Sequence, residues 1–141
     1  MPPPMIPASS TRGYQLAIEQ KPGYLHAVVT GPNSLENVTG YLDEVLGECI
    51  ARGCYRLLIE ERLEGPRLRT VEVFGIVSRG TQKVGGILRA IAYVDVNAAG
   101  DLMRFAETAA TNRGLPIALF PTVAEAEAWI VRTRPPAGAG T

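Results

Sequence analysis

Residues 54–60 read "CYRLLIE", and this run is apolar on both of its faces. Apolar runs of this length are typical of a central strand that is covered on at least one side. The segment that follows, "EERLEGPRLRT" at 60–70, is charged and contains a Gly65-Pro66 break. We therefore predict a buried strand that ends in a charged loop, and the neighbouring segments indicate the fold around it.

A hairpin is predicted on the amino-terminal side of this strand. Polar and apolar residues alternate over 14–19, which indicates a half-buried strand. Pro22 and Gly23 then occupy the two central positions that a type II turn prefers. A second strand over about 24–30 is expected to pair antiparallel with the first.

The clearest helix pattern lies between Ser34 and Gly53. Serine is a favourable N-cap residue, and glycine is favoured where a helix ends in a left-handed conformation. The apolar residues between these two positions recur at helical spacing: Leu35, Val38, Leu42, Val45, Leu46, Cys49 and Ile50. Because Cys49 belongs to this stripe, it is expected to be a small core residue rather than a reactive thiol.

Residues 70–78, "TVEVFGIVS", are compatible with two kinds of element. Their β-branched content permits a strand. Thr70 as a cap, Glu72 in the first turn and Gly80 after the end favour a short helix instead. We therefore expect a helix directly after the charged loop.

The carboxyl-terminal part adds two strands and two helices. The segment "GILRAIAYVDV" at 86–96 predicts a strand, and a helix is expected over 97–114. The segment "LPIALF" at 115–120 predicts a short buried strand. Thr122 and Glu125 then form a T-x-x-E capping box at the start of a last helix.

The predicted order is therefore β-β-α-β-α-β-α-β-α. After the hairpin each helix links two strands, and right-handed crossovers make such strands parallel neighbours. We expect an α/β fold with a mixed, mostly parallel sheet whose helices pack largely on one face. One domain is expected over 13–132, between a Pro-rich disordered tail at 1–12 and a second disordered tail at 133–141.

Three segments carry a resemblance to a known family: "YRLLIEE", "RAIAYVDV" and "ALFPTVAEAEAWI". They resemble the third strand, the fourth strand and the closing strand and helix of the SpoIIAA-like fold. This fold is shared by STAS domains and by bacterial SpoIIAA-like proteins of unknown role. The resemblance implies a small, regulatory, non-enzymatic module that binds a protein or small ligand through the loops at the strand ends.

The anti-sigma-factor antagonist branch of this family carries a phosphorylatable serine in an Asp-Ser-x-Gly segment after the third strand. The corresponding region here reads "GPRLRTVEVFG". Thr70 is its only hydroxyl near the expected place, Arg69 stands where the aspartate would be, and Glu72 replaces the glycine. The sequence therefore departs from the phosphorylation motif at two of its positions.

Composition limits the function classes. Of the 141 residues, 46% are hydrophobic and 20% are charged, and the formal net charge is zero. Such a balance gives no general attraction to nucleic acid or anionic lipid, so neither is expected as a partner. No segment approaches the roughly 20 apolar residues of a membrane span, and the first residues lack signal-peptide features, so a cytoplasmic protein is expected. Two cysteines and one histidine predict no zinc set, and no cofactor is expected.

The patterns for nucleotide binding and nucleophilic catalysis are incomplete. The segment "GTQKVGGIL" at 80–88 begins like a phosphate-binding loop, but Gly86 and Ile87 stand at the Lys and Ser/Thr positions. A glycine-rich turn entering a strand is expected there instead. His26 is the only histidine that could serve a nucleophile, and it is expected at the surface or edge of the second strand, without a fixed partner.

The charged segment at 60–70 is the best candidate site. Its glutamates alternate with arginines, which favours solvated ion pairs in a loop over an acid/base pair. Ligands of open parallel sheets bind outside the carboxyl ends of the strands, where this segment is expected to lie. Two interpretations of the region near Thr70 stay open: an anion bound by Arg67, Arg69 and the amino end of the helix, or a loop with paired surface charges. The predicted partner- and anion-binding residues are Glu60, Glu61, Arg62, Arg67, Arg69, Thr70, Asp95 and Asn97.

Two functions follow from these residues. The first is an interaction module that binds a protein or anionic partner through this segment. The alternative is a small-molecule or lipid-binding protein, or an unrecognised enzyme, with a pocket near 60–70 and 95–101. An exposed sheet edge beside the hairpin would also permit a homodimer.

Overall fold

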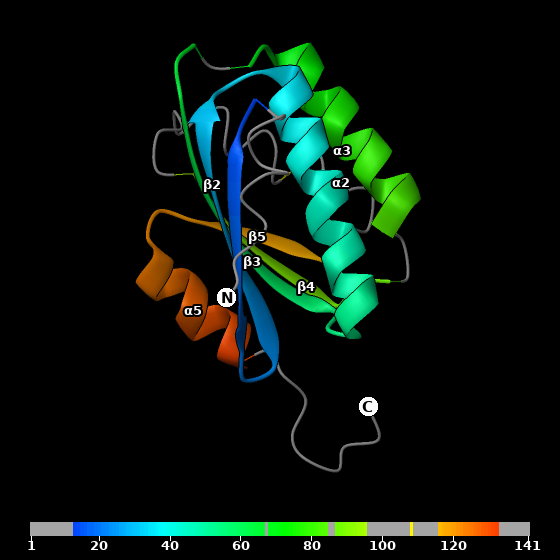
Figure 1. Cartoon of the computed structure of the whole chain (residues 1–141), viewed down its shortest axis with the longest axis vertical. Helices are drawn as coiled ribbons and strands as arrows, with labels where there is room; N and C mark the ends of the chain where they lie inside the picture. The colour runs from blue at the N-terminus through cyan, green and yellow to red at the C-terminus, as the bar shows by residue number, and fades with distance from the viewer. Residues whose placement is uncertain (1–12, 67, 85–86, 96–107, 109–115, 133–141) are drawn as a thin grey trace.

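The protein is built on a five-stranded mixed sheet (Figure 1). The computed structural model describes residues 13–66, 68–84, 87–95, 108 and 116–132. The strands are β1 (Gln15–Lys21), β2 (Tyr24–Pro32), β3 (Arg56–Glu64), β4 (Ala90–Asp95) and β5 (Ile117–Phe120). They lie in the order β1-β2-β3-β4-β5, and only the β1/β2 pair is antiparallel. The predicted α/β class and mixed, mostly parallel sheet are confirmed.

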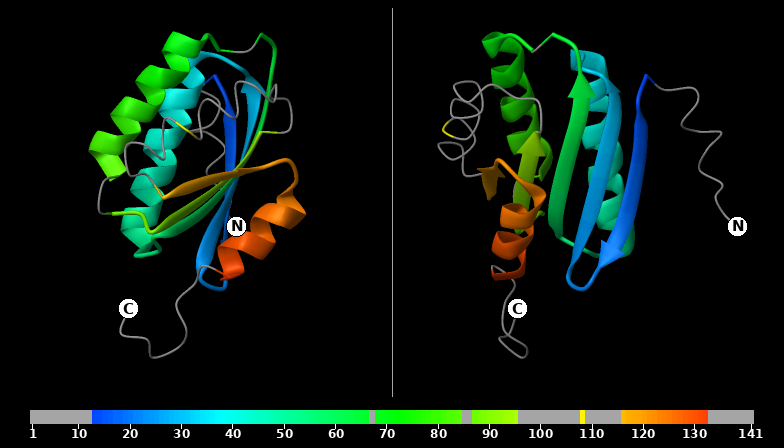
Figure 2. Two further views of the ribbon diagram at one scale, coloured as in Figure 1. Left: turned by 180° about the vertical axis from the view of Figure 1, so that it is seen from behind. Right: turned by 90° about the vertical axis from the view of Figure 1, so that its left-hand side faces the viewer.

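Helices cover both faces of this sheet (Figure 2). They are α2 (Leu35–Arg52), α3 (Thr70–Val84) and α5 (Val123–Arg132). Right-handed crossovers that add parallel strands in one direction place the connecting helices on one face of the sheet. The helices α2 and α3 share such a face. The third described helix, α5, covers the opposite face. The helix expected over 97–114 and both tails fall outside the described residues.

The larger core lies between the sheet and the face covered by α2 and α3. Leu25, Leu57 and Ile59 contribute from the strands, since alternate residues of a strand share a face. Tyr41 and Cys49 contribute from α2, and neither is exposed to solvent. Burial raises the pKa of the Cys49 thiol to about 12, so the prediction of a core residue is confirmed.

The smaller core, under α5, is built from smaller side chains. Its buried members include Ala90, Ala92 and Ala126, which allow the helix to approach the sheet closely. The rings of Phe120 and Trp129 close its rim, with centroids 5.6 Å apart.

The ends of α2 follow the predicted capping chemistry. The Ser34 hydroxyl accepts a hydrogen bond from the backbone N–H of Asn37 at 3.1 Å. Gly53 ends the helix in the left-handed conformation, with φ 63°. In the hairpin, Gly23 has φ 86°, the positive value that position i+2 of a type II turn requires.

Two predicted boundaries were wrong. The third strand does not end at Glu60 but continues through Glu64, because Glu60 and Glu61 find partners inside the protein. The helix α3 extends to Val84 and includes Gly80, which was expected to end it. The predicted glycine-rich turn before the fourth strand contains Gly85 and Gly86, which lie outside the described residues.

Candidate functional site

Glu60 and Glu61, which were predicted to lie in a solvated loop, are buried neighbours in β3. Their exposed fractions are 8% and 3%. Because successive side chains of a strand point to opposite faces, Glu60 faces α5 whereas Glu61 faces α2 and α3. The two glutamates therefore belong to separate polar clusters, one on each face of the sheet.

Glu61 lies in a cluster with two tyrosines and an aspartate. Asp95 is its register partner at the end of β4, and this parallel pairing places both carboxyl groups on the same face. The Tyr41 hydroxyl, from α2, donates a hydrogen bond to Glu61 Oε2. The hydroxyl groups of Tyr41 and Tyr93 are 3.4 Å apart. The cluster joins α2, β3 and β4 at the carboxyl end of the sheet.

The environment of Glu61 favours its protonated form. Burial, and then the negative charge of Asp95, raise the pKa of Glu61 to about 7, although hydrogen bonds from Tyr41 and Tyr93 act in the opposite direction. Burial and the charge of Glu61 likewise raise the pKa of Tyr41 well above its ordinary value. A carboxyl group that titrates near neutrality is chemically suited to acid/base exchange, but this one is sealed under α2.

Glu60 lies in a cluster of opposite electrostatic character. The His26 Nε2 atom is 2.9 Å from Glu60 Oε1, and Arg62 pairs with the other carboxyl oxygen. Burial alone would raise the pKa of Glu60, but the hydrogen bonds from Arg62 and His26 hold it below its ordinary value. The prediction that His26 lacks a fixed partner was wrong, because β2 is an inner strand and faces β3.

Arg62 and Arg69 of the segment are exposed, as is Glu64, whereas Glu60 and Glu61 are buried. The side chain of Arg62 is 50% exposed and that of Arg69 is 78% exposed. Arg69, rather than Thr70, precedes α3 as its N-cap: its carbonyl accepts the first helical hydrogen bond, from Val73 at 3.0 Å. Its own N–H donates to Glu72 Oε1 at 2.8 Å.

The turn between β3 and α3 is attached to the start of α2. The Asn33 backbone N–H donates to the Glu64 carbonyl at 2.6 Å, and its side-chain amide donates to the Pro66 carbonyl at 2.8 Å. Gly65 has φ 110°, a value that favours glycine. Arg62 lies before this turn and Arg69 lies at its end. Both exposed arginines are thus held next to a turn with a defined backbone.

The predicted site residues are therefore brought together only in part. Glu60 meets Arg62 on one face, and Glu61 meets Asp95 on the other. Thr70 begins α3. Arg67 and Asn97 fall outside the described residues. The tyrosines of the Glu61 cluster were missed, although the helical stripe of α2 passes through position 41.

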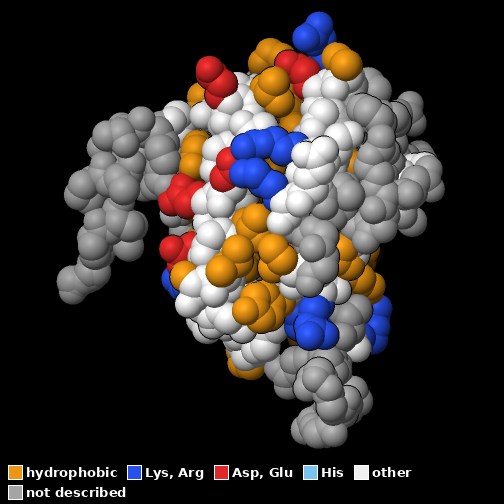
Figure 3. All heavy atoms as spheres, turned by 90° about the vertical axis from the view of Figure 1, so that its right-hand side faces the viewer, with side chains coloured by type: hydrophobic (Ala, Val, Ile, Leu, Met, Phe, Trp, Pro, Cys, Tyr) orange, Lys and Arg blue, Asp and Glu red, His pale blue; other side chains and the backbone are white. Residues whose placement is uncertain are grey.

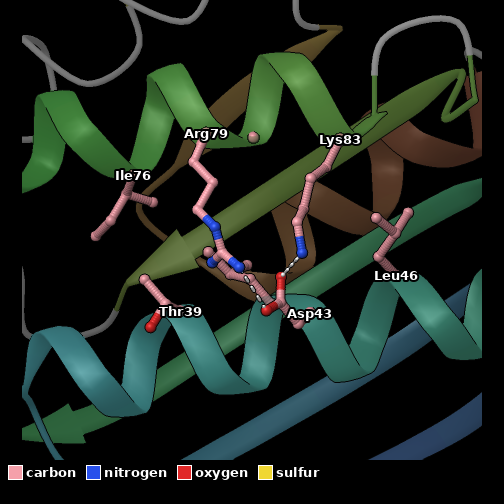
Figure 4. Close-up of a pocket in the computed structure, with 8 residues that line it drawn as sticks. Thr39, Asp43, Leu46, Ile76, Arg79 and Lys83 are labelled. Atoms are coloured by element: carbon pink, nitrogen blue, oxygen red, sulfur yellow. Dashed lines mark hydrogen bonds and ion pairs between the residues drawn. The ribbon is translucent and has the colours of Figure 1, made fainter.

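A groove between α2 and α3 is closed by ion pairs (Figure 4). Asp43 of α2 accepts hydrogen bonds from Arg79 and Lys83 of α3, each at 3.0 Å. Burial would raise the pKa of Asp43, but these two cations hold it below its ordinary value. Leu46 and Ile76 also line this groove, and the remaining space is about 40 Å³. On this side of the molecule basic and acidic side chains lie next to a hydrophobic area (Figure 3).

The comparisons with known proteins and the search for metal and membrane features assign no class. No protein-family model and no curated protein matches the chain. Within the described part of the chain, no group of three His, Cys, Asp or Glu residues is arranged to hold a metal ion. No helix among the described residues combines the length and apolar character needed to cross a membrane.

Proposed function

We propose that the protein is a non-enzymatic, STAS-like interaction module. In this proposal it binds an acidic partner, either a protein segment or a small anion, through the turn between β3 and α3. The contacts are made by Arg62 and Arg69, with Arg67 contributing from the same turn. The function is recognition and regulation rather than turnover.

The observation that carries this proposal is the separation of charges along β3 and its turn. Glu60 and Glu61 point inward and are buried, so their carboxyl groups make their contacts within the fold. Arg62 and Arg69 keep half or more of their side chains in solvent. A surface built in this way has guanidinium groups available to a partner, whereas the carboxyl groups of Glu60 and Glu61 are closed to a substrate.

The position of the turn adds independent support. It leaves the carboxyl end of a central parallel strand, which is where ligands of open α/β sheets bind. It also opens α3, a helix of 15 residues whose amino end favours a negative charge. Both effects favour an acidic group beside Arg69.

The test uses a hexa-aspartate peptide as the acidic probe, with affinity followed by calorimetry. The variant Arg62→Gln, Arg69→Gln removes two exposed charges and keeps the side-chain stems. We expect it to weaken binding by about tenfold, the effect of losing a charge-assisted hydrogen bond. The matched control Arg79→Gln, Lys83→Gln removes two charges from α3 and is expected to retain affinity. Equal weakening in both variants, or no binding by the unaltered protein, would contradict the proposal.

A second candidate is a small-molecule or lipid-binding protein, or an enzyme, with a pocket near 60–70 and 95–101. The observation that favours it is the Glu61–Asp95 pair, because acid/base residues typically have shifted pKa values. Glu61→Gln distinguishes the two. It would abolish ligand binding or turnover in the second candidate, and it would leave the acidic peptide bound in the first.

A further inference from the structure

A depression lies at the end of the sheet opposite to the β3–α3 turn. It forms where the parallel strands β2, β3 and β4 begin, beside the β1–β2 hairpin, whose turn is at the lower end of the sheet in Figure 2 (right). Its volume is about 450 Å³. Its lining residues come from three separate segments, namely the β1–β2 hairpin, residues 52–56 and the residue before β4: Gln20, Gly23, Arg52, Gly53, Cys54, Tyr55, Arg56 and Arg89.

Three arginines line this depression. Arg52 is in the last turn of α2, Arg56 opens β3, and Arg89 directly precedes β4. None of the described residues that line the depression is acidic. Because the whole chain has a formal net charge of zero, this concentration of positive charge is local.

The backbone around these arginines is held in place. The Arg89 N–H donates to the Tyr55 carbonyl at 2.7 Å, which joins the segment before β4 to the segment before β3. The Arg56 side chain is 6% exposed, and its guanidinium donates to the Ile130 carbonyl of α5. The guanidinium of Arg56 is thus held by α5, whereas Arg89 is exposed.

The remaining arginine, Arg52, is held only loosely. It pairs with Glu48 one helical turn earlier, at 2.9 Å, and the two side chains are 38% and 41% exposed. Exposed pairs of this kind are weak. A ligand that carries more negative charge than Glu48 can therefore compete for this guanidinium.

We propose that this depression binds a small multivalent oxyanion, a phosphoryl or carboxylate compound. Guanidinium groups form paired, parallel hydrogen bonds with both kinds of oxyanion. The two exposed guanidinium groups, those of Arg52 and Arg89, favour a ligand with more than one negative charge. The volume is within the range of about 300 to 1,000 Å³ that is usual for small-molecule sites. This site is separate from the β3–α3 turn and does not depend on the function proposed for it.

Cys54 provides a reporter within the lining. Its thiol is partly exposed, whereas Cys49 is fully buried and has a raised pKa. A neutral alkylating reagent is therefore expected to modify Cys54 and to leave Cys49 unmodified in the folded protein. An anion bound in the depression is expected to slow that modification, which places the binding event as well as detecting it.

The experiment uses inorganic pyrophosphate and citrate as the two probes, with glucose as a neutral control. Binding is measured by calorimetry, and the alkylation rate of Cys54 by iodoacetamide is measured by mass spectrometry. At least one probe is expected to bind and to slow alkylation. The probe that binds more tightly identifies the phosphoryl or the carboxylate class.

The variant Arg52→Gln, Arg89→Gln removes the two exposed charges and leaves the buried Arg56 in place. We expect it to weaken binding by about tenfold or more and to abolish protection of Cys54. The matched variant Arg79→Gln, Lys83→Gln is expected to change neither. Circular dichroism confirms that each variant is folded. Absence of binding by both probes, equal binding by the two variants, or binding without protection of Cys54 would each overturn the proposal.

Discussion

Glu60 and Glu61 are adjacent in the chain, and their environments shift their pKa values in opposite directions. Glu60 faces α5 and is held ionised by an arginine and a histidine, which lower its pKa. Glu61 faces α2, where burial and a neighbouring aspartate raise its pKa to about 7. A strand that alternates its side chains between two differently built faces can thus give two identical residues opposite electrostatic roles.

The largest effect on stability is expected from Glu61→Gln. This substitution removes the carboxyl group whose ionised form is disfavoured by burial and by Asp95. Glu61 binds a proton more tightly in the folded state than in the unfolded state, where its pKa has the ordinary value of 4.5. Its contribution to stability is therefore complete below pH 4.5 and is lost as the pH rises toward 7. A shift of this size corresponds to about 3 kcal/mol. We expect Glu61→Gln to be more stable than the unaltered protein at alkaline pH, by up to that amount.

The measurement is urea unfolding across pH, with the difference between the two proteins followed at each pH. The matched control is Glu64→Gln, because Glu64 is an exposed residue of the same strand. Its effect is expected to be within about 0.5 kcal/mol at every pH. If the difference between Glu61→Gln and the unaltered protein did not change between pH 4.5 and 7, the raised pKa would be wrong.

The substitution Glu60→Gln is expected to lower stability, whereas Glu61→Gln is expected to raise it. The folded-state pKa of Glu60 is lowered, so its contribution is present above its ordinary value of 4.5 and is lost as the pH falls through the folded-state pKa. The substitution removes charge-assisted hydrogen bonds with His26 and Arg62. We expect a loss of about 2 kcal/mol at neutral pH and a smaller loss in acid. A Glu60→Gln variant that loses more stability in acid than at neutral pH would contradict this assignment.

A smaller change is expected from Tyr41→Phe, which alters the Glu61 cluster without removing a carboxyl group. The Tyr41 hydroxyl donates to Glu61 and so lowers its pKa. Its loss is expected to cost about 1 kcal/mol and to move the titration of Glu61 to higher pH. The pH profile is the decisive measurement, because a purely steric effect would shift stability equally at all pH values.

The fold was largely predictable because local signals agree with each other. Alternation marks the hairpin, Ser34 and Gly53 mark the ends of α2, and the apolar run at 54–60 marks a central strand. The end of β3 was not predictable in this way. Charged residues normally indicate a loop, and only the partners supplied by other strands and by α2 keep Glu60 and Glu61 inside.

The candidate site was predictable in position but not in chemistry. The segment at 60–70 does leave the carboxyl end of a central strand, and the sequence pattern indicates this. Which glutamate would meet His26 and which would meet Asp95 depends on strand register, a long-range property. The arginine-lined depression was missed for the same reason, since Arg52, Arg56 and Arg89 have no local pattern in common.

The smallest effect is expected from Asp43→Asn, which tests whether burial sets the size of the effects at Glu60 and Glu61. Asp43 also has a lowered pKa and two cationic partners, but its side chain is 40% exposed and those of Arg79 and Lys83 are 45% and 42% exposed. Water and salt screen such pairs, so we expect a loss of less than about 1 kcal/mol that decreases further in about 1 M salt. Urea unfolding at low and high salt measures both changes. The loss from Glu60→Gln is expected to persist at high salt, because the pair that Glu60 forms with His26 is buried, with side-chain exposures of 10% and 12%. If the two losses responded equally to salt, burial would not account for the difference between the clusters.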